Sequence, residues 1–398
     1  MNCAGRQRRK ARNGPASSAN AVSPWIDMPA SGISMGAAMN VAVVGAGPIG
    51  CATAAYLLKQ GHRPALWSPT AARLRRHGAA VRYACTGSLD GWIELEWLGA
   101  PGELARFDVV IVCLPGNAYA SVLKPLSAVW RNGQTMVVSG ALSLCPLWLR
   151  DSAARRGREV HAVGWATTPT TAHFLADGRL HANPLRDRID MAGTERGAGA
   201  LALCAALLGP RFVDAGDLLA PTLANINPIA HAAEVIPNLT RMDKGEDWPL
   251  FGCFTPVVAR LAAELDRERL ALAAALGFAL PTLAEHYSRS YHIRQGPLHD
   301  MAAEIQARGM GPAGPASLAH RYVLEDAPFG LVFQEALARA ADVPSPLLSA
   351  CIDLLQAAYG RDFRTENFLV DELGLATGGI AALRNRCAAS HNADTLPR

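Results

Sequence analysis

A glycine-rich turn between an apolar run and a helical segment limits the fold of this chain more than any other feature. Residues 40–44 have the valine-rich composition of a buried parallel strand, and Gly45-Ala-Gly-Pro-Ile-Gly50 follows directly. Residues 51–60 have helical character and end at Gly61, and residues 63–67 form a second apolar run. A strand, a Gly-x-Gly-x-x-Gly turn, a helix and another strand are the order of a dinucleotide-binding βαβ unit.

The three glycines of this turn have separate mechanical roles. Gly45 permits the tight turn out of the strand, Gly47 lets the backbone approach a pyrophosphate, and Gly50 lets the helix pack close to the sheet. The start of the helix adds free N–H groups and a partial positive charge. We therefore expect a phosphate site made by Gly45, Gly47, Pro48, Ile49 and Gly50. The alternative is a tight structural turn without a ligand.

The end of the second strand bears on the choice of nucleotide. An NAD site usually places Asp or Glu here to hold the ribose 2′-hydroxyl, but residues 66–70 read Leu-Trp-Ser-Pro-Thr. Residues 71–76 are predicted as a short basic helix. The polar and basic side chains suit a 2′-phosphate, so the sequence favours NADPH over NADH, with these candidate contacts: Ser68, Thr70, Arg73 and Arg76. The alternative is that the arginines form a solvated helix face.

Further apolar runs extend the predicted sheet. Strands are expected over 81–84, 92–98, 108–114, 135–139 and 161–165, and the first two are candidates for a hairpin. The loop after 108–114 borders the crevice of an open α/β sheet, so it is a candidate cofactor or substrate loop. Its candidates are Leu114, Pro115 and Asn117 for the cofactor and Tyr119 for substrate. An ordinary connecting loop is the alternative.

The pattern changes near residue 215. From there to about 385 the chain is rich in Ala and Leu at helical spacing, most plainly over 261–276 and 347–359, without a strong strand signal. The predicted fold is an α/β N-terminal Rossmann domain with a doubly wound parallel sheet plus an all-α C-terminal domain. The expected division is a disordered basic extension 1–38, a nucleotide-binding domain 39–215, a helical domain 216–385 and a polar tail 386–398.

Charge and cysteine content exclude several function classes. The chain of 398 residues has 38 basic and 34 acidic residues, of which residues 1–38 hold five and one, so the body carries 33 of each. This neutral body argues against nucleic acid as a partner. The nine cysteines show no Cys-x-x-Cys pair, which favours reduced thiols and a cytoplasmic setting. No apolar run has the length of a membrane span.

The N-terminal extension does not read as a signal peptide. Its basic cluster is followed by Ser, Asn, Pro and Gly rather than by an apolar segment. Met35 and Met39 are alternative start positions, so the sequence leaves open whether residues 1–38 belong to the native protein. A tail that grips RNA or a membrane is the less favoured alternative.

Two segments of the helical half carry chemistry-bearing residues. The first, residues 225–231, reads Asn-Ile-Asn-Pro-Ile-Ala-His, with candidates Asn227 and His231. The second, residues 320–330, contains Arg321 and Asp326 before Pro328 and Gly330. Taken alone, His231 is more readily a hydrogen-bonded core histidine, Asn227 a helix cap, and the second segment a helix boundary with a surface salt bridge.

These motifs together resemble the octopine/nopaline (opine) dehydrogenase family, which includes opine-metallophore synthases. The likeness rests on the glycine turn, Trp-Ser-Pro after the second strand, Asn-Pro-x-x-His231 and Arg321-Tyr-x-x-Glu-Asp326-x-Pro-x-Gly, and it spans about residues 40–380. The resemblance implies a cleft between a Rossmann and a helical domain. It implies that His231 is catalytic, that Asp326 is its acidic partner and that Arg321 binds a substrate carboxylate. Ala232 stands where several members have proline, which bears on the substrate pocket.

The implied reaction condenses an amino-acid-type amine with a 2-keto acid, such as pyruvate or 2-oxoglutarate, and reduces the imine. Histidine suits the proton transfers near neutral pH, a guanidinium holds a carboxylate, and the nicotinamide supplies hydride. The favoured product is a metallophore-type opine. No metal-binding spacing is recognised, and a homodimer through the helical domain is the candidate assembly.

Two rival functions remain open. One is another two-domain reductase that resembles ketopantoate reductase or a 2-hydroxyacid enzyme. Such enzymes usually carry a catalytic lysine or a differently placed acid in the helical domain, and Lys244 is the one lysine after residue 125. The other is a non-catalytic NADP-sensing module.

Overall fold

The computed structural model describes residues 37–70, 74–194, 198–375 and 379–387. The predicted extension up to residue 36, Arg73 and most of the polar tail lie outside the described residues. The chain from Ala37 onward forms one unit, so contacts between its strands and helices are described together.

Six strands form the parallel centre of the sheet. Their spatial order is β5-β2-β1-β6-β7-β8, and each neighbouring pair is parallel. The sheet order thus reverses between β1 and β6, which makes a topological switch point at the carboxyl ends of these strands. Their bounds are β1 Asn40–Val44, β2 Arg63–Trp67, β5 Gly91–Trp97, β6 Val109–Val112, β7 Gln134–Val138 and β8 Val160–Trp165.

Antiparallel strands extend both edges beyond the predicted parallel sheet. The expected hairpin is present as β4 (Ala80–Gly87) against β5. The predicted helix over 71–76 is wrong at its described end, because Arg75 and Arg76 lie in β3 (Arg75–His77), which pairs antiparallel with β4 around Gly78, whose φ is 59°. Pairing with β4 determines that this segment is a strand, and short-range helix propensity does not reveal such a partner. Residues 71–73 lie outside the described residues. The remaining strands are β9 Ala172–Phe174, β10 Leu180–Ala182, β11 Ile189–Gly193 and β12 Phe212–Asp214.

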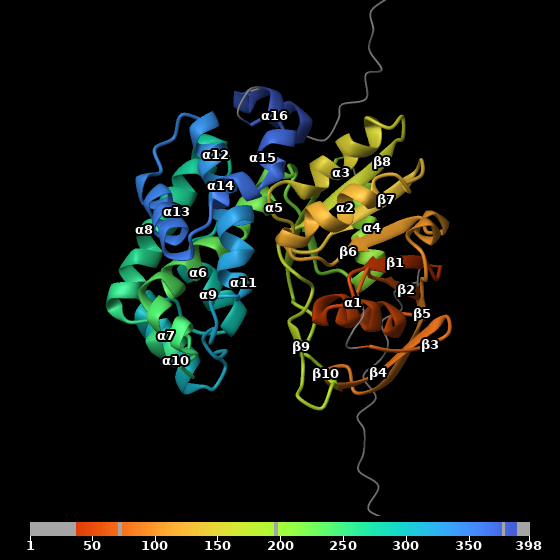
Figure 1. Cartoon of the computed structure of the whole chain (residues 1–398), viewed down its shortest axis with the longest axis horizontal. Coiled ribbons are helices and arrows are strands. Elements are labelled where there is room, and N and C mark those ends of the chain that lie inside the picture. Colours follow the sequence, from red (N-terminus) through yellow and green to blue (C-terminus); the bar gives the residue numbers. More distant parts are fainter. Residues whose placement is uncertain (1–36, 71–73, 195–197, 376–378, 388–398) are drawn as a thin grey trace, which may run out of the picture. The chain divides into compact units, whose positions relative to one another are not determined.

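Helices cover both faces of the sheet, as a doubly wound fold requires (Figure 1). Val41 and Val43 of β1 point into one core with helices α1 (Pro48–Lys59) and α4 (Ala198–Leu208). Ala42 and Val44 point into the other, with α2 (Tyr119–Leu126) and α3 (Cys145–Ala154). This alternation follows from the two-residue period of a strand.

From Leu219 onward the described residues form helices and loops, with one isolated β-bridge between Pro249 and Ala313. The predicted helices over 261–276 and 347–359 correspond to α8 and α13. Helix α16 runs two residues past the proposed domain end at 385, because Cys387 is buried. The α-helices are α5 Leu219–Ala224, α6 Asn227–Val235, α7 Leu239–Lys244, α8 Pro256–Ala275, α9 Leu283–Tyr291, α10 Leu298–Ala307, α11 Arg321–Leu324, α12 Val332–Ala340, α13 Pro346–Tyr359, α14 Phe363–Glu366, α15 Phe368–Glu372 and α16 Gly379–Cys387.

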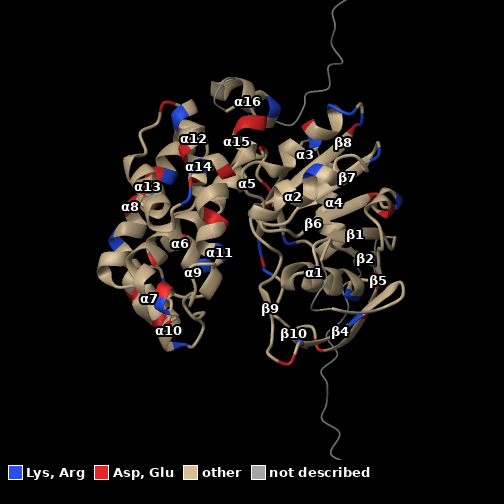
Figure 2. Ribbon diagram, viewed as in Figure 1, with Lys and Arg blue, Asp and Glu red and all other residues tan. Residues whose placement is uncertain are grey.

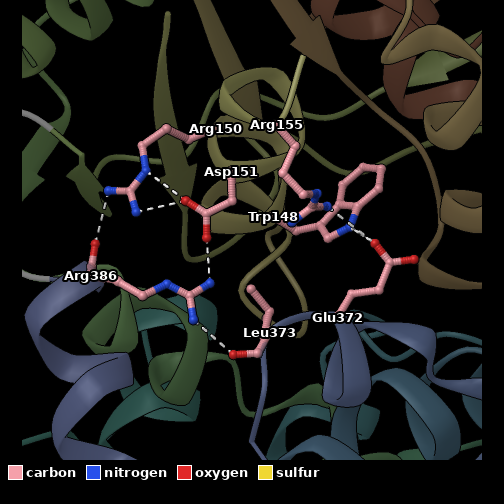
Figure 3. Close-up of polar contacts among 7 residues, drawn as sticks. All are labelled: Trp148, Arg150, Asp151, Arg155, Glu372, Leu373 and Arg386. Atoms are coloured by element: carbon pink, nitrogen blue, oxygen red, sulfur yellow. Dashed lines mark hydrogen bonds and ion pairs between the residues drawn. The ribbon is translucent and has the colours of Figure 1, made fainter. Parts of the chain in front are cut away.

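The two halves share a hydrophobic core and a polar contact. One core cluster contains sheet residues such as Val112 together with Phe333 and Leu337 of α12. Polar contacts join α3 to the last helices (Figure 3): Trp148 Nε1 donates to Glu372 Oε2 at 2.6 Å, and the Arg386 guanidinium pairs with Asp151. The C-terminal helices therefore fasten the helical half to the nucleotide-binding half.

Charged residues are dispersed over the described fold. Lys and Arg alternate with Asp and Glu along the ribbon of both halves in Figure 2. Within the described ranges, no helix combines the length and apolar character needed to cross a membrane.

Candidate active site

The glycine turn has the geometry of a phosphate cradle. Gly45 has a φ of +115°, and a Cβ there would lie 2.4 Å from the Cys113 carbonyl oxygen. A Cβ on Gly50 would lie 1.9 Å from the Gly45 carbonyl oxygen, so this glycine packs the helix onto the turn. A Cβ on Gly47 would meet nothing within 4 Å. Gly47 therefore leaves open space beside the turn into which a ligand can approach the backbone.

The start of α1 is suited to an anion. Gly47 is the N-cap, Pro48 occupies the first turn, no side chain of the described residues caps the helix, and the first turn has no acidic residue. The first N–H groups thus face the open space beside Gly47. These residues fit the pyrophosphate of a nicotinamide dinucleotide.

The end of β2 lies beside this turn. Ser68 Oγ donates to the Thr70 carbonyl at 2.6 Å, which closes a short turn after Trp67. Residues 68–76 contain no Asp or Glu. Arg76 lies in β3 at the sheet edge. The arrangement leaves two hydroxyl groups where an NAD site would place its carboxylate.

The loop after β6 connects the nucleotide edge to the helical half. Pro115 and Asn117 are exposed, and Leu114 is half-buried. Tyr119 is fully buried and packs edge-on against Phe329, with ring centroids 5.9 Å apart. The Tyr119 ring is thus a buried packing element between this loop and Phe329, and it is not exposed to solvent.

His231 and Asp326 form a buried pair. They lie 95 residues apart in the chain, and His231 Nδ1 is 2.7 Å from Asp326 Oδ2. A carboxylate only accepts hydrogen bonds, so Nδ1 donates and Nε2 keeps a free lone pair. The Tyr322 ring stacks on the imidazole at 3.5 Å. Burial lowers the pKa of His231, and Asp326 partly opposes this shift. The imidazole is therefore a neutral base near pH 7.

Close packing between the two predicted motifs holds this pair in place. Asp326 is the N-cap of the π-helical turn η5 (Ala327–Leu331), and Pro228 lies in the first turn of α6. A Cβ on Gly330 would lie 2.3 Å from Pro228 Cγ, so only glycine lets the two segments approach. The Asn-Pro and Pro-x-Gly parts of the motifs therefore act as the two sides of one contact.

A second network links η5 to the Rossmann half. Ser143, which has a φ of 52°, donates its hydroxyl to the Phe329 carbonyl. Asn367 Nδ2 donates to Ser143 Oγ at 3.0 Å and to the Pro328 carbonyl at 2.9 Å. Sequence reasoning missed Ser143 and Asn367, because neither lies in a motif and the contacts of Ser143 with Phe329 and with Asn367 span 186 and 224 residues.

Arg321 and Glu325 connect the His231–Asp326 pair to the loop after β6. Arg321 Nη1 lies 3.3 Å from Glu325 Oε2, and the Arg321 side chain is 55% exposed. Glu325 Oε1 accepts the Gly116 N–H at 3.0 Å. Burial, with a contribution from Asp326, raises the pKa of Glu325 to about 7. Sequence reasoning gave Glu325 no role, although it is adjacent to Asp326 in the motif.

Other polar groups extend the site. Asn227 is the first residue of α6, is half-buried and donates its N–H to Asn225 Oδ1 at 3.0 Å. Glu234, one turn after His231, is buried against Tyr287. Arg186, from the loop between β10 and β11, lies near enough to Tyr291 and His286 of α9 to influence their pKa values. Sequence reasoning missed Arg186.

The fold and site define a class of protein before any comparison. A Rossmann sheet presents a dinucleotide cradle at its switch point, and a helical domain brings a buried histidine–aspartate pair against the loop that borders it. This is the arrangement of a two-domain nicotinamide-dependent oxidoreductase.

Comparison with known proteins shows which families the two halves of the chain match. Residues 214–359 match the family described as NAD/NADP octopine/nopaline dehydrogenase, alpha-helical domain. Residues 41–139 match the ketopantoate reductase family PanE/ApbA, which covers only the nucleotide-binding part. The opine dehydrogenase of Arthrobacter sp. (strain 1C) is 28% identical over 353 residues, which are 86% of this chain and 97% of that protein.

Solved structures show the same fold. Octopine dehydrogenase in complex with NADH and L-arginine has a TM-score of 0.65 at 17% identity, over 88% of this chain and 94% of that one. Yersinopine dehydrogenase with NADP⁺ bound has a TM-score of 0.65 at 16% identity, over 84% and 98% of the two chains. The helical half of the chain thus carries an octopine/nopaline dehydrogenase domain over residues 214–359, and the protein is an NAD(P)-dependent oxidoreductase that acts on CH–NH donors.

Proposed function

We propose that the protein is an NADPH-dependent opine dehydrogenase that condenses an amino-acid-type amine with a 2-keto acid, such as pyruvate or 2-oxoglutarate, and reduces the resulting imine. The observation that carries this proposal is the buried pair of His231 and Asp326, whose Nδ1 and Oδ2 atoms lie 2.7 Å apart. The neighbouring Glu325 accepts a hydrogen bond from Gly116 in the proposed cofactor loop. The proposal assigns His231 as a neutral base near the edge of the sheet at which the nicotinamide is proposed to bind. Nicotinamide supplies the hydride when the cofactor is bound.

His231 is the proposed proton carrier. The amine enters as an ammonium ion and must lose a proton before it attacks the keto carbon, and the carbinolamine hydroxyl must gain one to leave as water. Neutral Nε2 of His231 can accept the first proton and deliver the second. Asp326 holds the imidazole by Nδ1 and stabilises the imidazolium between the two transfers. The Tyr322 ring fixes the plane of the imidazole.

Arg321 is the proposed binder of a substrate carboxylate. Glu325 holds one of its nitrogens, and the exposed remainder of the guanidinium is free to take a carboxylate oxygen pair. Asn227, at the start of the same helix as His231, is proposed to contact substrate with its amide. We assign Tyr119 an indirect substrate role, through its contact with Phe329, because its ring is buried.

The proposed cofactor is NADPH, bound by Gly45, Gly47, Pro48, Ile49 and Gly50, with Leu114, Pro115 and Asn117 on the nicotinamide side. Ser68, Thr70, Arg73 and Arg76 are proposed to bind the 2′-phosphate, and the absence of an acid over residues 68–76 of the sequence supports this choice. We expect kcat/KM for NADPH to exceed that for NADH at least about tenfold, since one hydrogen bond to a charged group contributes about 1.5 kcal/mol. Equal use of both cofactors would remove this part of the proposal.

Three finer statements belong to the same proposal. The domains divide at residues 215 and 216, the product is a metallophore-type opine, and the protein is a cytoplasmic homodimer that contacts its copy through the helical domain. Light scattering tests the dimer, and titration of the purified product with divalent metal ions tests the product class.

The decisive experiment is a substrate-pair screen. NADPH oxidation is followed with each 2-keto acid, with and without each amine, and the product is identified by mass. Turnover that needs both substrates, with a secondary amine as product, is the expected result. Turnover with the keto acid alone would instead indicate the simple reductase suggested by the PanE/ApbA match. NADPH binding without turnover by any pair would favour a sensor.

A further inference from the structure

Glu234 has an unpaired oxygen deep inside the site. The residue is 3% exposed and lies on α6, three residues after His231, so the two side chains share a helix face. Glu234 Oε1 accepts the Tyr287 hydroxyl at 3.4 Å. Its Oε2 is buried and has no hydrogen-bond partner within the described residues. Seven buried side-chain atoms of the described residues lack a hydrogen-bond partner, and Glu234 Oε2 is the one carboxyl oxygen among them. A buried carboxyl oxygen without a donor is costly, so Oε2 is the atom of this group at which a hydrogen-bond donor is expected to bind.

The surroundings of Glu234 are aromatic and acidic. Tyr287 and Tyr291 of α9 and Tyr322 of α11 lie around it, and Asp326 faces it from the start of η5. The described residues contribute no cation that forms an ion pair with it. Burial, with a contribution from Asp326, raises the pKa of Glu234 to about 8. The carboxyl group is therefore mostly neutral at pH 7 until a positive charge arrives.

We propose that Glu234 receives an organic cation of the amine substrate, an ammonium or guanidinium group, and gives up its own proton to solvent when that cation binds. The proposal rests on the proposed function. The step changes no covalent bond to carbon: a neutral carboxyl group and a cation become an ion pair, and one proton leaves to the buffer. The cation supplies the N–H donors that Oε2 lacks, and its charge pairs with the carboxylate that remains.

Either the α-ammonium group or a cationic side chain of an amino acid can provide this cation. A pair of matched ligands distinguishes the two. L-Lysine and L-norleucine have the same chain length, but only lysine carries a side-chain ammonium. Each is titrated calorimetrically into the NADPH-loaded enzyme at pH 7, in two buffers of different ionisation heat. The proton release of E234Q is subtracted from that of the wild type, because an amine that binds as the free base releases a proton in both.

We expect a difference close to one proton, about 0.9 for a group of pKa about 8 at pH 7. We also expect at least about tenfold weaker binding to E234Q. A difference with lysine alone assigns the side-chain cation, and a difference with both ligands assigns the α-ammonium. E246Q removes an exposed carboxylate beside Arg241 and is the matched control, which should behave as wild type.

A second measurement does not depend on the variant. The infrared C=O band of the protonated carboxyl group should disappear from the wild-type spectrum when the amine is added. A band that persists, equal proton release in E234Q and wild type, or failure of both amines to bind would overturn the proposal. Proton release without turnover in any substrate pair would leave the cation receptor standing and contradict the dehydrogenase function instead.

Discussion

Glu325 Oε1 accepts a hydrogen bond from the backbone N–H of Gly116 at 3.0 Å, across 209 residues of chain. Gly116 lies in the loop at the carboxyl end of β6, and Glu325 precedes the acidic partner of His231. Contact is close here, since a Cβ on Gly116 would lie 2.8 Å from Phe329 Cβ. This bond therefore joins the loop after β6 to the segment that carries Asp326.

The first prediction concerns the two contacts of Glu325. In E325Q the amide oxygen can still accept the Gly116 N–H, but the charge that holds Arg321 is lost. We expect KM for the 2-keto acid to rise about tenfold or more, since a hydrogen bond between charged groups contributes about 1.5–3 kcal/mol. KM for NADPH should change little in E325Q and should rise in E325A, which loses both contacts. Steady-state kinetics of the two variants checks this, and an E325Q profile identical to wild type would contradict it.

The second prediction concerns the histidine–aspartate pair. H231A and D326N should each lose about 10²- to 10⁴-fold in turnover, the usual contribution of a positioned proton carrier. NADPH affinity should stay near the wild-type value, because neither residue touches the nucleotide cradle. Stopped-flow turnover and fluorescence titration with NADPH measure the two quantities. Near-normal turnover in H231A would remove the assignment of His231.

The third prediction follows from the direction of the His231 pKa shift. Burial disfavours the imidazolium, so the pKa lies below its usual value and the neutral base persists as the pH falls. The acidic limb of kcat/KM that belongs to His231 should therefore lie below about pH 6.5. Asp326 raises this pKa, so the limb should move lower still in D326N.

Glu325 can also titrate in this range, because its pKa is about 7. The pH profile of E325Q therefore serves as the control. A limb that persists in E325Q and moves down in D326N belongs to His231. A limb that vanishes in E325Q belongs to Glu325 and would contradict the assignment.

The fourth prediction separates two glycines of the same turn. G47A should fold normally, because its Cβ meets nothing within 4 Å, but should bind NADPH at least about tenfold more weakly if the cofactor fills that space. G50A should lose about 1–3 kcal/mol of unfolding free energy or more, because its Cβ would lie 1.9 Å from the Gly45 carbonyl oxygen. Urea unfolding and NADPH titration of both variants give the comparison. Unchanged NADPH affinity in G47A would contradict the cradle.

The fifth prediction concerns the contact between the two helical motifs. A Cβ on Gly330 would overlap Pro228, so G330A should destabilise the protein by about 1–3 kcal/mol and displace Asp326 from His231. The double variant with Pro228→Gly should recover part of the loss in both stability and turnover. Strictly additive effects in the double-mutant cycle would show that the contact is not the cause.

The sequence by itself determined the features that depend on neighbouring residues. The turn at Gly45–Gly50, the parallel strands around it and the change to helices near residue 215 follow from composition, periodicity and backbone freedom. The edge strand Arg75–His77 escaped prediction, because its pairing with β4 overrides the helical propensity of the segment. The edge strands β9, β10, β11 and β12 were not predicted either, because pairing with other strands of the sheet forms them.

Only the tertiary structure decided how the site is assembled. His231 meets Asp326 across 95 residues, and Gly116 meets Glu325 across 209. Sequence patterns contain no distances between such segments, so the family resemblance could suggest partners but not the roles of Glu325, Ser143 or Asn367. The unpaired oxygen of Glu234 is likewise a result of packing. A carboxyl oxygen lacks a hydrogen-bond partner only where packing has excluded water from it.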